Sequence, residues 1–109
     1  MYIDINEADW KLYRSRLVNW QEAFMEKICK EYISILQADK NASNRFWELH
    51  DRLKEDSAKT GVVARKARSS MIHNILNLLQ ESAITDEDLE GFSDKLVERI
   101  KFMQDNFID

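Results

Sequence analysis

Residues 6–38 read NEADWKLYRSRLVNWQEAFMEKICKEYISILQA, and this stretch decides the fold. Its large apolar residues recur at spacings of three, four or seven, which is the pattern of an amphipathic helix. The stripe comprises Trp10, Tyr13, Leu17, Trp20, Phe24, Ile28, Tyr32 and Ile35. We therefore expect one helix of about 50 Å. Because a compact domain of this length is smaller, the helix should bend, break or extend past its neighbours.

Three further amphipathic stretches follow, at about 44–58, 62–82 and 86–107. The best-marked boundary is the start of the last one, where Thr85 and Asp88 form the pattern of a capping box. The chain has no proline and only two glycines, Gly61 and Gly91, which disfavours a fold of many short strands. Short connections favour antiparallel neighbours. The sequence predicts an all-α single domain (1–109), an antiparallel bundle of three long helices and one short helix.

Composition narrows the class of protein. Hydrophobic residues make up 44% of the 109 residues and charged residues 33%, with a net charge of −4, which is typical of a folded domain with a solvated exterior. No apolar run approaches the roughly 20 residues that span a bilayer, and the first residues do not form a signal peptide. We expect a soluble, cytoplasmic protein. The single cysteine, Cys29, is expected to pack in the core.

Residues suited to catalysis or metal binding are sparse. His50 and His73 lie 23 residues apart, and neither belongs to a His-x-x-x-His or Glu-x-x-His arrangement. The carboxylates fall on helix faces and at caps, and no nucleophile stands beside a base in an identifiable pattern. We therefore expect no enzyme activity, no metal and no cofactor.

Large aromatic residues give the leading functional hypothesis. The long first helix is too long for three shorter helices to cover, so part of it should meet another protein, including a second copy in a homodimer. The candidate partner interface consists of Trp10, Tyr13, Trp20, Phe24 and Trp47. The same aromatic residues could instead line a pocket for a small molecule.

A basic cluster gives the competing hypothesis. Residues 61–80 carry three cations and no acid, a pattern that can bind phosphates near a helix start. The candidate anion or nucleic-acid contacts are Lys59, Arg65, Lys66 and Arg68. The sequence pI near 5.2 and the acidic last helix disfavour nucleic acid as the partner.

Several short motifs carry a resemblance over about residues 45–103. They are Arg45-Phe46-Trp47, Arg68-Ser69-Ser70-Met71, Asn74-Ile75, Ile84-Thr85-Asp86-Glu87-Asp88-Leu89 and Phe92-Ser93. In these the chain resembles small uncharacterised helical proteins of Gram-positive bacteria and their mobile elements. Some of those proteins are labelled multidrug transporters, although this chain lacks a candidate membrane span. The resemblance implies an accessory or regulatory role, including binding and inhibiting another protein, and it supplies no site residues.

Overall fold

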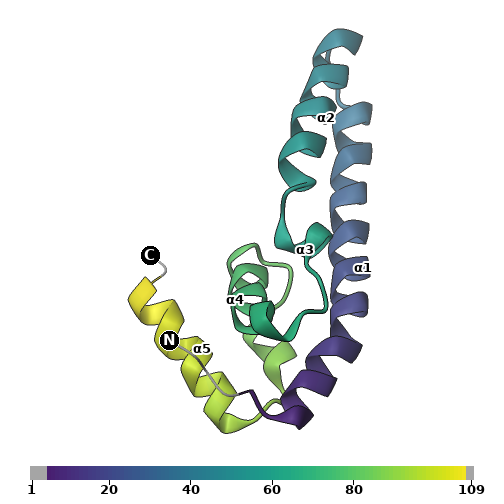
Figure 1. Cartoon of the computed structure of the whole chain (residues 1–109). Coiled ribbons are helices and arrows are strands. Elements are labelled where there is room, and N and C mark those ends of the chain that lie inside the picture. The colour runs from purple at the N-terminus through teal and green to yellow at the C-terminus, as the bar shows by residue number, and fades with distance from the viewer. Residues whose placement is uncertain (1–4, 108–109) are drawn as a thin grey trace.

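A computed structural model describes residues 5–107, and every regular element in that range is helical. The α-helices are α1 (Glu7–Gln37), α2 (Ala42–Asp56), α3 (Thr60–Val63), α4 (Met71–Gln80) and α5 (Asp94–Phe107). Two short 3₁₀ helices, η1 (Arg68–Ser70) and η2 (Asp86–Leu89), precede α4 and α5 (Figure 1). The all-α prediction is confirmed.

Helix α1 is continuous from Glu7 to Gln37, so of the three alternatives left open by the sequence a break does not occur. The side chain of Asn6 caps its start by accepting a hydrogen bond from the Asp9 amide at 2.7 Å. Most of the predicted stripe is buried, and Trp10 and Tyr32 are half-buried. The buried members are Tyr13, Leu17, Trp20, Phe24, Ile28 and Ile35.

The molecule is elongated, with extents of 52 × 28 × 22 Å. Helix α1 runs the length of one side, and α2 returns antiparallel beside its C-terminal half, so the two form a projecting hairpin (Figure 1). The main hydrophobic core lies at the other end, where the first half of α1 packs with α4, η2 and α5. The expected single core enclosed by all the helices is therefore wrong, because α2 buries no apolar residue.

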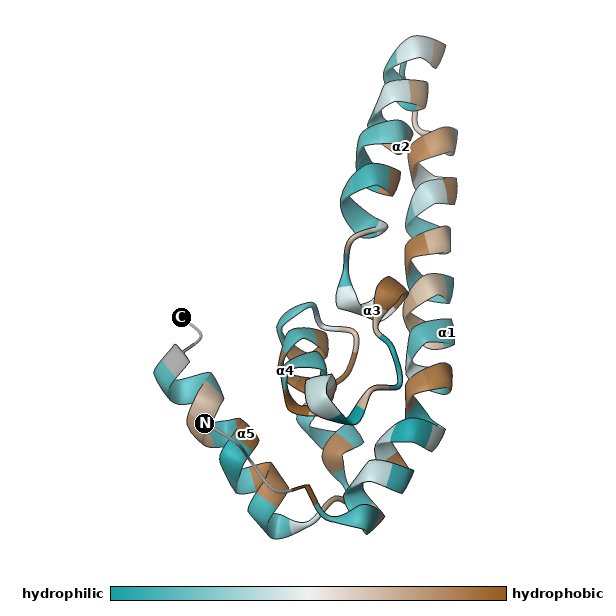
Figure 2. Ribbon diagram, viewed as in Figure 1, coloured by the Kyte–Doolittle hydropathy of each residue, from teal (hydrophilic) through white to brown (hydrophobic). Residues whose placement is uncertain are grey.

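Hydropathy agrees with this division. Helix α2 is mostly hydrophilic, whereas α4 is hydrophobic over most of its length (Figure 2). Five residues of α4 are buried: Met71, Ile72, Ile75, Leu76 and Leu78. Helix α4 is therefore packed into the hydrophobic core.

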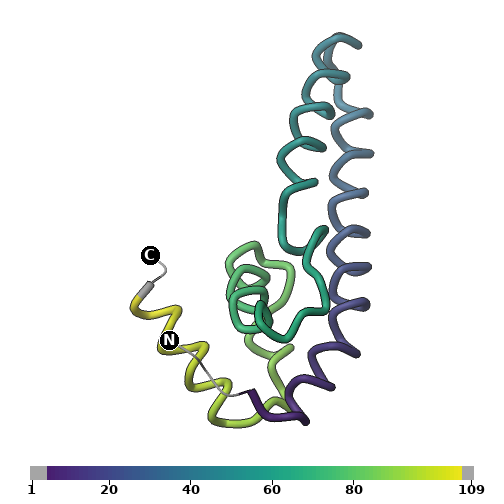
Figure 3. Tube along the Cα trace, viewed as in Figure 1, coloured from purple at the N-terminus to yellow at the C-terminus, as the bar shows by residue number. Residues whose placement is uncertain are grey.

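The expected helix 62–82 is interrupted. The chain leaves α3 after Val63 and runs in extended conformation before η1 and α4 begin (Figure 3). Side chains of α1 donate hydrogen bonds to carbonyls of this connection: Gln21 donates to the Ala64 carbonyl at 2.9 Å, and Tyr13 donates to the Arg65 carbonyl at 3.2 Å. These tertiary hydrogen bonds replace the ones that a continuous helix would make.

The last predicted helix also starts later than expected. The capping box of Thr85 and Asp88 is present, but it begins the short η2 and not the long helix. Gly91 then adopts a φ of 95°, which breaks the helical path and suits glycine. Helix α5 begins at Asp94, with the Ser93 hydroxyl 3.3 Å from the Leu96 amide that it caps.

Gly61 lies at a close contact between two helices. It is buried in α3, where a Cβ atom would collide with the ring of Phe24 on α1. Glycine is therefore required here by the close approach of the two helices. Within residues 5–107, no helix is both long enough and apolar enough to cross a membrane.

Candidate protein-interaction surface

The hairpin is held together by a buried carboxylate. Asp56, at the end of α2, is 1% exposed and accepts a hydrogen bond from the Tyr32 hydroxyl of α1 at 2.7 Å. Lys59 Nζ lies 3.0 Å from Asp56 Oδ1, and Arg52 Nη2 lies 3.4 Å from Oδ2. The same guanidinium reaches Glu31 of α1 at 2.7 Å. Polar groups thus connect the end of α2 to α1.

These contacts change the acidity of the groups involved. Burial alone would raise the pKa of Asp56, but hydrogen bonds from Tyr32 and Lys59 and the charges of Lys59 and Arg52 lower it below its ordinary value. Burial, followed by the hydrogen bond to the Asp56 carboxylate, raises the pKa of Tyr32 to about 12. Asp56 is therefore a charged group and Tyr32 a neutral donor at physiological pH.

The contacts between α1 and α2 determine which residues lie on one outer side of the hairpin. On α1, Ile28, Tyr32 and Ile35 face inward or contact α2. On α2, Arg45 donates to the Leu36 carbonyl at 2.8 Å and Arg52 reaches Glu31. The next residue after each inward position is rotated by about 100° around its helix. Because α1 and α2 run antiparallel, the residues that follow the inward residues of α1 lie on the same side of the hairpin as those that follow the inward residues of α2.

We call this side the hairpin face. It consists of Cys29, Ile33 and Leu36 from α1 and Phe46, His50 and Leu53 from α2. Each of these residues follows an inward-facing or half-buried residue by one position, and all six are exposed. The hairpin face is therefore a continuous stripe that the chain itself leaves uncovered.

The exposure is large for apolar side chains. The exposed fractions are 53% for Ile33, 44% for Leu36, 61% for Phe46 and 48% for Leu53. Trp47, 57% exposed, stands at the edge of the face, with its ring 5.0 Å from Phe46 and 5.3 Å from His50. Scattered exposed apolar residues are ordinary on soluble proteins, but a cluster on one projecting element is typical of an interaction site.

The predicted interface residues differ widely in exposure. Tyr13, Trp20 and Phe24 are 0%, 8% and 4% exposed, so they are packed inside this chain and cannot form an accessible surface. Trp10 is half-buried between Arg14 and Arg68, whose guanidinium carbons lie 5.7 and 5.3 Å from its ring centre. Of the five, only Trp47 is largely exposed.

The predicted basic contacts do not form one cluster of available cations. Lys59 is paired with Asp56, and Arg68 is paired with Glu7 at 2.6 Å while covering Trp10. Arg65 and Lys66 are exposed on the connection between α3 and η1. They lie on an extended segment, not at the start of a helix as expected. Two of the four predicted phosphate contacts therefore already have anionic or aromatic partners.

Cys29 also differs from expectation, because it is exposed on the hairpin face instead of buried in the core. The expected position of the α1 stripe was correct, but Cys29 lies one residue beyond Ile28 and therefore outside the buried stripe.

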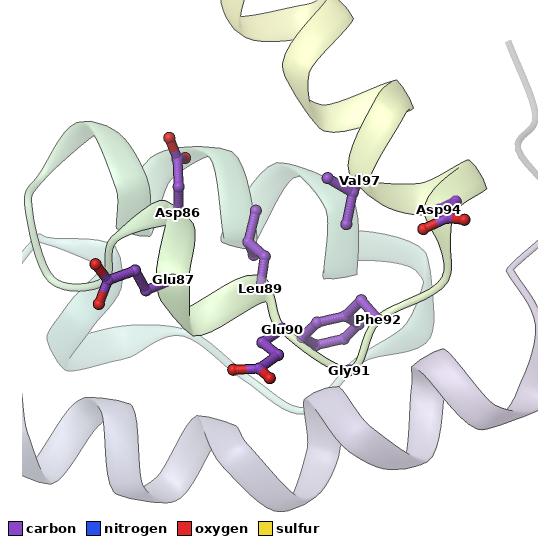
Figure 4. A pocket seen from close by; sticks show the side chains of 8 residues that line it. All are labelled: Asp86, Glu87, Leu89, Glu90, Gly91, Phe92, Asp94 and Val97. Carbon is purple, nitrogen blue, oxygen red and sulfur yellow. The ribbon is translucent and has the colours of Figure 1, made fainter.

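A surface pocket of about 450 Å³ lies where η2 meets α5 (Figure 4). Its lining consists of Asp86, Glu87, Leu89, Glu90, Gly91, Phe92, Asp94 and Val97. The carboxylates spread outward instead of converging on one point (Figure 4). Across the described part of the chain, no group of three or more His, Cys, Asp or Glu side chains is placed to hold a metal ion. None of the predicted aromatic interface residues lines this pocket.

Comparison of the chain with protein-family models, curated proteins and solved structures gives no match. The resemblance to helical proteins of Gram-positive bacteria stays a prediction.

Sequence reasoning missed most of the hairpin face. The stripe of Phe46, Leu49 and Leu53 in α2 was expected to point to the core, as apolar stripes usually do. A second, polar stripe of α2 indicates the opposite orientation. It consists of Arg45, Arg52 and Asp56, which share one side of the helix, with Arg52 and Asp56 four residues apart. That polar stripe is the one that meets α1.

Proposed function

We propose that this chain is a non-enzymatic protein-binding module that uses the hairpin face as its docking surface. The observation that carries the proposal is the hairpin itself, in which α2 buries no apolar residue yet exposes Phe46, Trp47 and Leu53. Water-exposed apolar area of this kind is stabilised when another protein covers it. Aromatic residues at the centre of such a patch are the usual energetic anchors of an interface.

The proposal keeps the protein-binding role expected from the sequence and moves its location. The exposed half of α1 contributes through Ile33 and Leu36, while the aromatic anchors come from α2. Protein binding by a small module also fits the accessory or regulatory role that the family resemblance implies. Nucleic-acid binding is less well supported, since Lys59 and Arg68 already have partners within the chain.

The test is site-specific photocrosslinking in the cells that naturally make the protein. A benzophenone amino acid replaces Phe46, which lies on the hairpin face, and in a matched variant replaces Asp51, an exposed residue on the other side of α2. We expect a discrete adduct, identified by mass spectrometry, from position 46 only. Adding Leu53→Glu should remove that adduct, because a charge at the centre of the face opposes desolvation.

No adduct from position 46 or from a second probe at position 53 would overturn the proposal. Equal adducts from positions 46 and 51 would also overturn it, because contact would then not depend on the hairpin face.

A further inference from the structure

We infer that the partner on the hairpin face is a second copy of this chain. In this arrangement two hairpins pack face to face, and α1 and α2 of each copy together form a four-helix assembly related by a twofold axis. The inference rests on the proposed function and identifies its partner. Three observations support this arrangement.

The first observation is the charge of the face. Its six residues, Cys29, Ile33, Leu36, Phe46, His50 and Leu53, include no Asp, Glu, Lys or Arg. An uncharged surface can meet an identical copy of itself without placing like charges together. The same patch then serves both copies, as a twofold interface requires. The hairpin face meets that condition.

The second observation is the area that is available. Large apolar and aromatic side chains cover up to 150–250 Å² each, so the exposed fractions of Ile33, Leu36, Phe46, Trp47 and Leu53 offer roughly 500 Å² per copy. Two copies together would bury about 1,000 Å² from these residues alone, which reaches the lower limit expected of a biological interface. The flanking polar side chains would add to it.

The third observation is the weakness of α2 by itself. It is a helix of 15 residues whose only buried side chain is the charged Asp56. Helices of this length are marginal in water unless an apolar face is covered. A second copy is present whenever the chain is made, and its hairpin would cover Phe46 and Leu53. Dimerisation would therefore complete the packing of the hairpin.

The decisive measurement is the mass of the purified full chain by sedimentation equilibrium over a range of concentrations. We expect wild type to approach twice 12.9 kDa. Leu53→Glu and Ile33→Glu should each weaken self-association by at least about tenfold. Ala23→Glu introduces the same charge at an exposed position of α1 on the side away from the face, and it should leave the mass unchanged.

Cysteine crosslinking checks the same interface without placing a charge in it. In a Cys29→Ser background, single cysteines at positions 33 and 53 should give disulfide-linked dimers on mild oxidation, whereas one at position 23 should not. Circular dichroism would show whether a glutamate variant fails to fold. In that case the cysteine variants would still test the interface.

A folded wild-type chain that stays monomeric at every concentration, with no crosslink at 33 or 53, would overturn the inference. If the photocrosslinking probe at position 46 still captured a different protein, the proposed function would stand and only the identity of the partner would be wrong. If the chain dimerised but Leu53→Glu and Ile33→Glu did not weaken the dimer, the interface would lie elsewhere and the inference would fail.

Discussion

Asp56 shows how a single residue fixes the geometry of the hairpin. Its carboxylate is almost fully buried, and it is stabilised by the Tyr32 hydroxyl and by the cations of Lys59 and Arg52. A buried carboxylate without such partners would cost several kcal/mol. Because both the partners and the charge are needed, Asp56 aligns the end of α2 with Tyr32 in the C-terminal half of α1.

The lowered pKa of Asp56 predicts how stability depends on pH. A folded pKa below the ordinary 3.8 means that the charged form is favoured in the folded state. The stabilisation is therefore present above that ordinary pKa and is lost as the pH falls through the lowered value. Asp56→Asn should reduce stability at neutral pH by about 1–3 kcal/mol. The free energy of unfolding of this variant should also fall less than that of wild type as the pH is lowered into the acid range.

Urea unfolding at a series of pH values, at fixed protein concentration, measures this effect. Asp51→Asn is the matched control, because Asp51 lies on the same helix with a side chain that is 80% exposed. Curves for wild type and Asp56→Asn that stay parallel from neutral pH into acid would contradict the assignment.

At the scale of elements, the ends of α1 and α5 are joined through one carboxylate. Asp9, 4% exposed in the first turn of α1, accepts hydrogen bonds from the Ser93 amide at 2.8 Å and the Ser93 hydroxyl at 2.6 Å. Ser93 in turn caps α5. Arg16 of α1 adds a hydrogen bond to the Asp88 carbonyl at 3.0 Å. The segment before α5 is thus held by side chains of α1.

Replacing Asp9 should loosen α5 before the rest of the molecule. Asp9→Asn replaces one carboxylate oxygen with an amide N–H₂ group, which cannot accept a hydrogen bond from Ser93. We expect the free energy of unfolding to fall by about 1–3 kcal/mol. Hydrogen exchange should accelerate most in the first turns of α5. Glu98→Gln, an exposed change on α5, is the control. Uniform acceleration over all helices would show that Asp9 does not act through α5.

At the scale of the whole molecule, the core and the hairpin are stabilised differently. The core packs apolar residues from α1, α4 and α5, whereas α2 is attached by ion pairs and hydrogen bonds. Surface ion pairs contribute little compared with apolar burial. The elongated shape follows, because α2 extends away from the core together with the second half of α1 (Figure 1).

The different stabilisation of the core and the hairpin predicts that their amides differ in protection from hydrogen exchange in the monomer. In the Leu53→Glu variant, which should be monomeric, amides of α2 should exchange hydrogen faster than those of α4, because α4 is packed on the core. In wild type, the dimer that we propose should raise the protection of α2 and change that of α4 little. Mass-spectrometric hydrogen exchange measures both. Equal protection of α2 and α4 in the monomeric variant would contradict the division.

The sequence by itself determined the features that depend on neighbours along the chain. The spacing of Tyr13, Leu17, Trp20 and Phe24 predicted α1 and its buried stripe, since helical periodicity is a local property. The capping box at Thr85 was also local, and it is present. The all-helical class followed from the same patterns and from the absence of proline.

Tertiary structure decided the features that depend on residues far apart in sequence. The breaks before α4 and α5 exist because Gln21, Tyr13 and Asp9 of α1 hydrogen-bond to the connecting segments, and no local pattern announces such partners. The side of α2 that meets α1 was decided by Asp56, because its buried charge needs Tyr32 of the other helix. That choice leaves Phe46 and Leu53 exposed and creates the hairpin face.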